Sequence, residues 1–351
     1  MATAPLTTRL DGIQALRGIA ATMVVIYHAG GLVQSRTGMF DWQLSSGGWA
    51  GVDLFFVISG FIIMYIHGDK PGAATPRELR TYVWKRFRRV LPPYWVALAF
   101  TVAAYILVDS AGEDRWQNTG FMVENILLIL PRVDGYLLGV AWTLPYEIMF
   151  YAIFGLFLWR PLFGMTAAAA WSLVAIYATL SQPFTPAGFF GMPFPLHFAL
   201  GMICARTVLH GASERLRILL LPGCAILALG AYLPDLVRDE ALFFVETPAS
   251  RLLPAIGAFL IVLAVAGRDV EGGTTAGSVL HWTGDMSYSL YLVHFPVMAA
   301  AAMALDRMGI GNEWIFWPVL LSAAFSAGFL FFHIFERPLL KLKPPRLIPS
   351  T

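Results

Sequence analysis

The chain has 351 residues and a formal charge of +2, with 58% hydrophobic and only 13% charged residues and a mean hydropathy of +0.66. So little polar surface excludes a soluble globular protein, and a charge near zero argues against nucleic acid as a partner. We therefore expect an all-α polytopic membrane protein that forms one domain over residues 1–351. Both cysteines, Cys204 and Cys224, lie in apolar stretches, which predicts buried free thiols.

The first apolar stretch, residues 10–31, is long enough to cross a bilayer whose hydrocarbon core is about 30 Å thick. It carries Arg17 and His28, and ionisable groups inside a spanning helix are costly enough to indicate a function. Successive residues turn by about 100°, so these two side chains lie on one helix face, roughly 16 Å apart. We expect this stretch to be retained as a helix and not removed as a signal peptide.

Ten apolar stretches predict membrane-spanning helices, and one shorter stretch, 121–130, predicts a re-entrant or interfacial helix. The ten cover residues 13–33, 51–67, 90–108, 141–159, 164–180, 195–210, 217–234, 251–267, 286–305 and 314–334. The connection 68–89 is rich in Lys and Arg, so the positive-inside rule predicts that it lies in the cytoplasm. Both termini are then cytoplasmic as well, while 109–140 and 235–250 lie outside.

Six short strings follow one another along the chain: LDGIQALRGIAATMVVIYH, GVDLFFVISGF, RFRRVLPPYW, WTLPYEIMFY, SYSLYLVHFP and FERP. Together they resemble the membrane acyltransferase-3 family, and the first is most similar to its exopolysaccharide-production branch. The resemblance implies transfer of an acyl group, usually acetyl, from cytoplasmic acetyl-CoA to a sugar hydroxyl, often at the outer side of the bacterial inner membrane. The implied acceptor is a polysaccharide or lipid-linked sugar in contact with the lipid bilayer, and polysaccharide-assembly proteins are candidate partners.

Two residues are candidate catalytic groups. His28 lies near the outer end of the first span, where the family has a histidine, and a neutral imidazole can take a proton from an acceptor hydroxyl. The span 141–159 enters from outside, so we expect Glu147 at a depth comparable with His28, where its carboxylate would orient the ring or position the sugar. The structural alternatives are a histidine bonded to a backbone carbonyl and a glutamate bonded to the amides at a helix start.

Three arginines are candidate donor-binding residues. Arg86 and Arg89 match the family's string before the third span, and guanidinium groups bind phosphates such as those of coenzyme A well. Arg17 lies in the inner half of the first span, where it would meet the phosphates or the pantetheine arm. The alternatives are anchoring at the membrane boundary and snorkelling of the side chain, and we assign Arg88 to anchoring.

Other residues of the strings receive secondary assignments. Asp53 and His294 are candidate substrate-binding residues, although an aspartate at a helix start is as well explained as a cap. Gly60 is better explained by helix packing than by ligand contact. Glu336 is expected to form a structural pair with Arg337 at the inner boundary.

Several alternatives stay open. Direct transfer and an acyl-histidine intermediate are both compatible with these residues. No metal is expected, because the sequence has no HExxH motif, His/Cys cluster or paired-carboxylate spacing. A secondary transporter, a non-catalytic scaffold, and an acyltransferase with another acyl donor or a small glycosylated acceptor are the competing interpretations.

Overall fold

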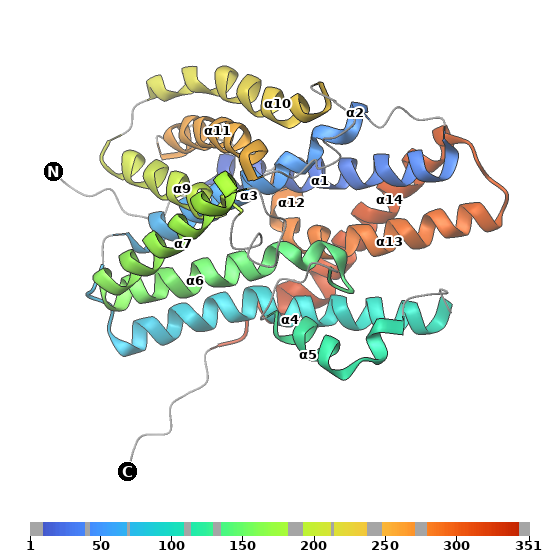
Figure 1. Cartoon of the computed structure of the whole chain (residues 1–351), viewed down its shortest axis with the longest axis horizontal. Coiled ribbons are helices and arrows are strands. Elements are labelled where there is room, and N and C mark those ends of the chain that lie inside the picture. Colours follow the sequence, from blue (N-terminus) through green and yellow to red (C-terminus); the bar gives the residue numbers. More distant parts are fainter. Residues whose placement is uncertain are drawn as a thin grey trace, which may run out of the picture.

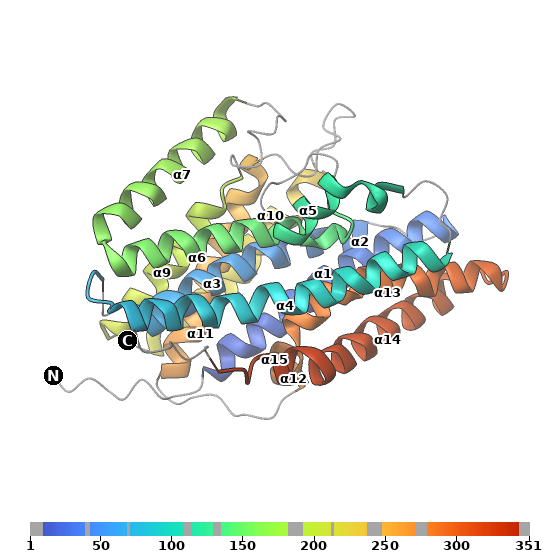
Figure 2. The same ribbon diagram turned by 90° about the horizontal axis from the view of Figure 1, so that it is seen from below.

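The computed structural model describes residues 10–38, 43–68, 71–108, 114–128, 135–181, 192–211, 214–236, 248–270 and 279–343. Within these ranges all regular structure is helical. Eight of the described helices are long and apolar enough to cross a membrane, and two shorter apolar helices accompany them. The prediction of an all-α polytopic membrane protein is confirmed (Figures 1 and 2).

Each predicted span has a helix in its place. These helices are α1 (Asp11–Thr37), α3 (Gly51–His67), α4 (Pro76–Val108), α6 (Leu144–Trp159), α7 (Pro161–Ser181), α9 (Phe194–Leu209), α10 (Leu220–Leu236), α11 (Leu252–Val270), α13 (Ser287–Arg307) and α14 (Glu313–Phe331). Short elements join them: α2 (Gln43–Ser46), η1 (Gly47–Ala50), η2 (Asp114–Gln117), α5 (Thr119–Leu127), η3 (Gly139–Thr143), η4 (Glu214–Leu219), η5 (Pro248–Arg251), α12 (Val279–Asp285), the π-helical turn η6 (Phe332–Glu336) and α15 (Arg337–Leu339).

Glycines allow the closest crossings in the bundle. A Cβ atom on Gly60 of α3 would lie 2.2 Å from the carbonyl oxygen of Phe198 in α9, and one on Gly201 would lie 2.0 Å from that of Val57. Only a residue without a side chain permits such an approach of two backbones. The packing explanation for Gly60 is therefore confirmed.

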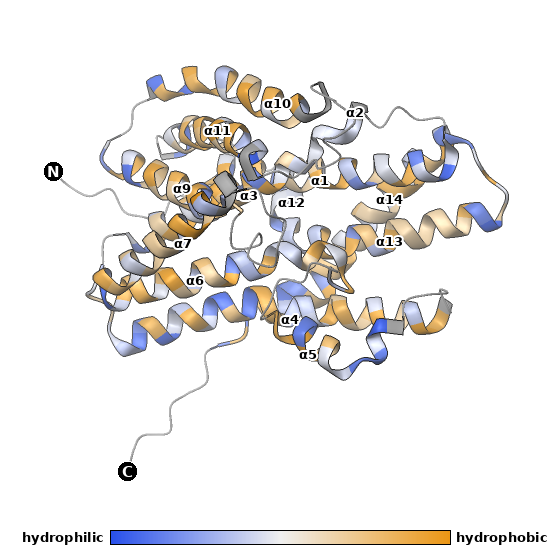
Figure 3. Cartoon of the chain, viewed as in Figure 1, coloured by the Kyte–Doolittle hydropathy of each residue, from blue (hydrophilic) through white to orange (hydrophobic). Residues whose placement is uncertain are grey.

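Helix α4 begins much earlier than predicted. Its first residue is Pro76, whereas the basic sequence predicts that residues up to Arg89 lie in a connection between spans. A capping box starts the helix, since Thr75 Oγ1 accepts the Glu78 amide and the Glu78 carboxylate accepts the Thr75 amide. The first turns of α4 are hydrophilic (Figure 3), and the full helix is about 50 Å long at ~1.5 Å per residue. Its basic first part therefore extends beyond the hydrocarbon core.

The segment before α6 is folded into the bundle. Helix α5 has nine residues, too few to span, and the buried Asn125 ties it to the following chain by accepting the Leu137 amide at 3.0 Å. Tyr94 of α4 donates to the carbonyl oxygen of Asn125 at 2.7 Å. Leu138 and Val140 are also buried, so α6 begins inside the bundle and not at its surface.

Helix α10 lies at the edge of the molecule, beyond α11 (Figure 1). Cys224 on α10 is exposed, whereas Cys204 on α9 is buried. The expectation of two buried thiols is therefore wrong for Cys224, because its side chain faces an open groove between α10 and α1.

Candidate active site

A cavity of about 340 Å³ lies among α1, α3, α4, α6 and α13. Its walls combine apolar side chains of α3 with polar side chains from all five helices. The polar members are Gln14, Arg17, Ser59, Arg86, Arg89, Thr143, Glu147, Tyr151, Ser287, Tyr288 and Tyr291. The three arginines predicted to bind the donor and the predicted catalytic glutamate thus lie in one site.

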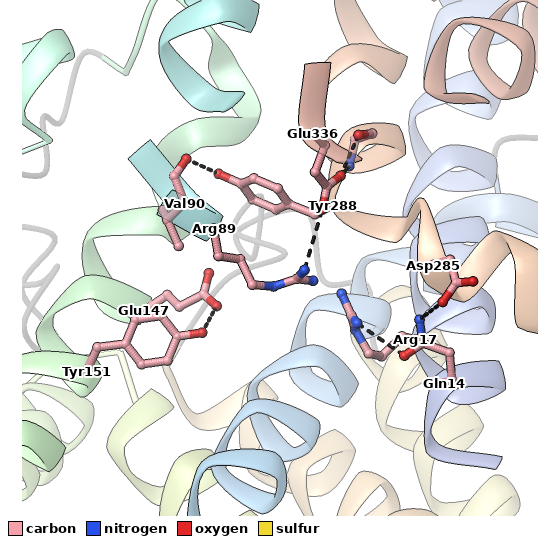
Figure 4. Close-up of polar contacts among 10 residues, drawn as sticks. Gln14, Arg17, Arg89, Val90, Glu147, Tyr151, Asp285, Tyr288 and Glu336 are labelled. Atoms are coloured by element: carbon pink, nitrogen blue, oxygen red, sulfur yellow. Dashed lines mark hydrogen bonds and ion pairs between the residues drawn. The ribbon is translucent and has the colours of Figure 1, made fainter. Parts of the chain in front are cut away.

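Arg89 is held by a fully buried carboxylate. Its guanidinium lies 3.4 Å from Oε1 of Glu336, and the other carboxylate oxygen accepts the Ser289 amide at 3.1 Å (Figure 4). Arg337, the partner expected for Glu336, is exposed instead. The buried carboxylate is therefore compensated by a cation and two donors, since the Ser289 hydroxyl also donates to it.

Arg86 has aromatic neighbours in place of a carboxylate. Its guanidinium carbon lies 6.0 Å from the Tyr82 ring centroid and 5.5 Å from that of Tyr151, within reach of cation–π attraction. Its buried Nε has no hydrogen-bond partner among the described residues. Arg86 therefore offers the cavity a positive charge and an unsatisfied donor.

The other charged groups of the cavity have polar neighbours. The Tyr151 hydroxyl donates to Oε1 of Glu147. Arg17 donates to the Gln14 side chain at 3.2 Å, and Gln14 donates to Asp285 at 2.8 Å. Figure 4 shows the side chains of Arg17, Arg89 and Glu147 converging from three helices on the same space.

His28 lies outside the lining of this cavity, next to a second histidine. Its ring centroid is 5.2 Å from that of His294 and 5.1 Å from that of Phe295. His294 is fully buried, with Nδ1 at 3.0 Å from the Leu290 carbonyl and 2.8 Å from the Tyr291 carbonyl. Because Nδ1 faces two acceptors it carries the proton, and Nε2, which has no partner among the described residues, is left as an acceptor.

A hydrogen-bonded bridge lies between the histidine pair and the cavity. The ring centroids of Tyr291 and His294 are 6.0 Å apart, and the Tyr291 hydroxyl lies 2.8 Å from Oγ1 of Thr143. Tyr291 and Thr143 also line the cavity. Tyr291 therefore connects the histidine pair to the cavity that the arginines line.

Glu147 lines the cavity together with Arg17, whereas the ring neighbours of His28 are His294 and aromatic side chains. The depth predicted for Glu147, comparable with that of His28, remains a prediction. The roles predicted for Glu147 and His28 remain predictions.

Asp53 lies in a buried ionic cluster and not in the cavity. His197 Nε2 lies 2.7 Å from one carboxylate oxygen and Arg251 donates to the other at 2.9 Å, and all three side chains are at most 1% exposed. The Arg251 guanidinium also lies 4.4 Å from the Trp49 ring centroid. Nothing in the sequence singled out His197 or Arg251, which lie far from Asp53 along the chain. A role of Asp53 in substrate binding remains a prediction.

Comparison with known proteins now assigns the family. Residues 10–333 match the model of the acyltransferase-3 family, an acyltransferase domain. The chain belongs to this family. It is therefore an acyltransferase and a multi-pass membrane protein, and the transporter interpretation falls away.

Three similar proteins extend this assignment. The chain is 31% identical over 308 residues to exopolysaccharide production protein ExoZ of Rhizobium meliloti, covering 84% of this chain and 90% of that protein. It is 26% identical to the putative peptidoglycan O-acetyltransferase YrhL of Bacillus subtilis, over 94% of this chain and 55% of that protein. It is 25% identical to acyltransferase MdmB of Streptomyces mycarofaciens, over 96% of this chain and 93% of that protein. No solved structure matches the chain.

Proposed function

We propose that this acyltransferase moves an acetyl group from acetyl-CoA to a hydroxyl of a sugar in an exopolysaccharide or related cell-surface glycan. It would do so in the bacterial inner membrane, with both termini in the cytoplasm. The observation that carries the proposal is the cavity where Arg17, Arg86 and Arg89 meet Glu147 inside the bundle. The similarity to the exopolysaccharide production protein ExoZ and to the putative peptidoglycan O-acetyltransferase YrhL supports the choice of acceptor.

The donor fits the basic side of the cavity. Phosphate and thioester oxygens are acceptors, and Arg86 presents a buried donor without a partner among the described residues. A neighbouring hollow of about 290 Å³ at the start of α4 is lined by Arg77 and Lys85 and shares Tyr82 with the surroundings of Arg86. We assign the coenzyme A nucleotide to this end of α4 and the thioester arm to the cavity.

The acceptor would enter from the opposite side, where His28 lies. In direct transfer, His28 takes the proton of the sugar hydroxyl while its oxygen bonds to the thioester carbonyl carbon. The carbon–sulfur bond then breaks, and the departing sulfur takes the proton from His28. His294, whose ring centroid lies 5.2 Å from that of His28, would orient the His28 ring by packing against it, and Glu147 would position the sugar from the cavity. A route through acetylated His28 uses the same groups in two steps.

Thiol release by the purified protein tests the activity. With acetyl-CoA and the glycan, we expect free coenzyme A thiol to appear in proportion to the glycan acetylated. A protein that releases no thiol under these conditions would not be the proposed enzyme. Glycan acetate content with and without the gene, resolved by linkage, identifies the modified hydroxyl.

Variants test the residue roles. His28→Ala and Glu147→Gln should lose turnover while the protein still inserts and expresses, and near-native turnover of either would remove that residue from the mechanism. Arg86→Gln with Arg89→Gln should weaken donor binding more than acceptor binding. Arg88→Gln is the matched control, because Arg88 lies outside the cavity and donates to the Leu342 carbonyl.

The donor route also depends on orientation. Labelling of single cysteines placed in residues 71–75 should show this connection on the cytoplasmic side. Exposure outside the cell membrane would contradict the route from the start of α4.

A further inference from the structure

A long apolar groove runs along the outside of the bundle between α1, α10 and α11. It encloses about 1140 Å³, much more than the cavity among the arginines. Helix α10 packs on α11, and the C-terminal part of α10 also contacts η1. The space between α10 and α1 is left open. The groove is independent of the proposed chemistry, since it shares no lining residue with the cavity.

The groove and the cavity lie on opposite sides of α1. Ala15, Ile19 and Met23 face the groove, whereas Arg17 faces the cavity. Two residues along a helix are about 200° apart, so this separation follows from the helical repeat. Helix α1 is therefore the wall between the two spaces.

The dimensions of the groove suit one lipid chain. Along α1 it extends from Gly12 to Ile26, about 21 Å at ~1.5 Å per residue, and along α10 from Leu220 to Tyr232, about 18 Å. One leaflet contributes roughly half of a hydrocarbon core of about 30 Å. An acyl chain from one leaflet, about 15 Å deep, can therefore lie along most of the groove.

One end of the groove is lined by basic side chains. At the end where α1 and α10 begin and α11 ends, it is lined by Arg217 and Arg268, both exposed. Asp269, next to Arg268, is buried, and its carboxylate accepts the Gly12 and Ile13 amides at 2.9 Å each. Guanidinium groups at one end of an apolar groove match a phosphate above an acyl chain.

We propose that this groove binds an anionic phospholipid, with an acyl chain between α1 and α10 and the phosphate headgroup at Arg217 and Arg268. Under the predicted topology this is the cytoplasmic leaflet. Two basic side chains at an anionic membrane surface give a preference of about 30-fold over a lipid without net charge. The bound lipid would support α1 from the side opposite the acyl-transfer cavity.

Cys224 supplies a site-specific measurement, because it is exposed and lines the groove. The full chain carrying Cys204→Ser is placed in nanodiscs of phosphatidylcholine, and alkylation of Cys224 by a small maleimide is timed. At the 30-fold preference, replacing a tenth of the lipid by phosphatidylglycerol with the same acyl chains fills roughly three quarters of the grooves with it and should slow alkylation about fourfold. Arg217→Gln with Arg268→Gln should abolish this slowing, and the corresponding double Lys variant should keep it.

Arg215→Gln is the matched control, because Arg215 lies in the same short helix as Arg217 but does not line the groove. It should respond to phosphatidylglycerol as the parent does. Equal alkylation rates in both lipids, or equal slowing in the double Gln variant, would overturn the proposal. Stronger protection by an isoprenoid phosphate than by phosphatidylglycerol would also overturn it. If the double Gln variant does not fold, Arg268→Gln alone should reduce the slowing, and an unchanged response would count against the proposal.

Discussion

The buried cluster of Asp53, His197 and Arg251 allows a quantitative prediction. Asp53→Asn keeps the shape of the side chain but leaves a guanidinium that is 1% exposed without its carboxylate. Breaking a buried ion pair costs about 3–5 kcal/mol, and the retained amide oxygen recovers about 1 kcal/mol of hydrogen bonding. We therefore expect Asp53→Asn to lower the unfolding free energy by about 2–4 kcal/mol, a large part of a typical total of roughly 5–15 kcal/mol.

The assay is reversible unfolding of the purified protein in mixed micelles, with a double-mutant cycle. Asp53→Asn and Arg251→Gln together should cost less than the sum of the single changes, by at least ~1 kcal/mol. Asp306→Asn is the control, since its pair with Arg36 is 35% and 41% exposed and should contribute less than about 1 kcal/mol. A cost below ~0.5 kcal/mol for Asp53→Asn, or additive effects, would refute the reasoning. Unchanged stability with a raised acceptor KM would instead support the substrate-binding role.

Three further predictions concern the cavity and its frame. Glu336→Gln removes the negative charge that pairs with Arg89. The loss of one charged hydrogen bond should raise the KM for acetyl-CoA about tenfold in steady-state kinetics. An unchanged KM would mean that Arg89 does not need this partner. Tyr151→Phe removes the donor to Glu147 and should lower turnover by up to about tenfold with little change in unfolding, whereas full turnover would show that the bond is dispensable. Gly60→Ala places a Cβ atom 2.2 Å from a backbone oxygen of α9 and should lower the unfolding free energy by about 1–3 kcal/mol, which a variant as stable as the parent would contradict.

The positions of the spans could be predicted from the sequence because each is a long apolar run, and the hydrocarbon core sets its length. The start of α4 could not be predicted from hydropathy, because the charged residues Arg77 and Arg80 have the low hydropathy that is typical of a loop. The capping box formed by Thr75 and Glu78 is the local sequence signal that marks the start of the helix.

The sequence predicts which residues belong to the site, but it does not predict which of their side chains contact one another. The family strings placed Arg17, Arg86, Arg89 and Glu147 among the candidates, and the structure brings them to one cavity. Which carboxylate faces which arginine depends on tertiary packing, so the partner of Glu336 was assigned to its neighbour in sequence. Asp53 shows the same limit, since its partner Arg251 is 198 residues away and no local pattern connects them.

The distance between Gln14 and Asp285 along the chain, 271 residues, has a consequence for biosynthesis. At about 5–20 residues per second, a ribosome needs roughly 15–50 s to add the 271 residues that separate Gln14 from Asp285. During that interval Arg17 enters the bilayer without its final neighbours. A nascent chain released early would therefore lack the α13 side chains that line the cavity with Arg17.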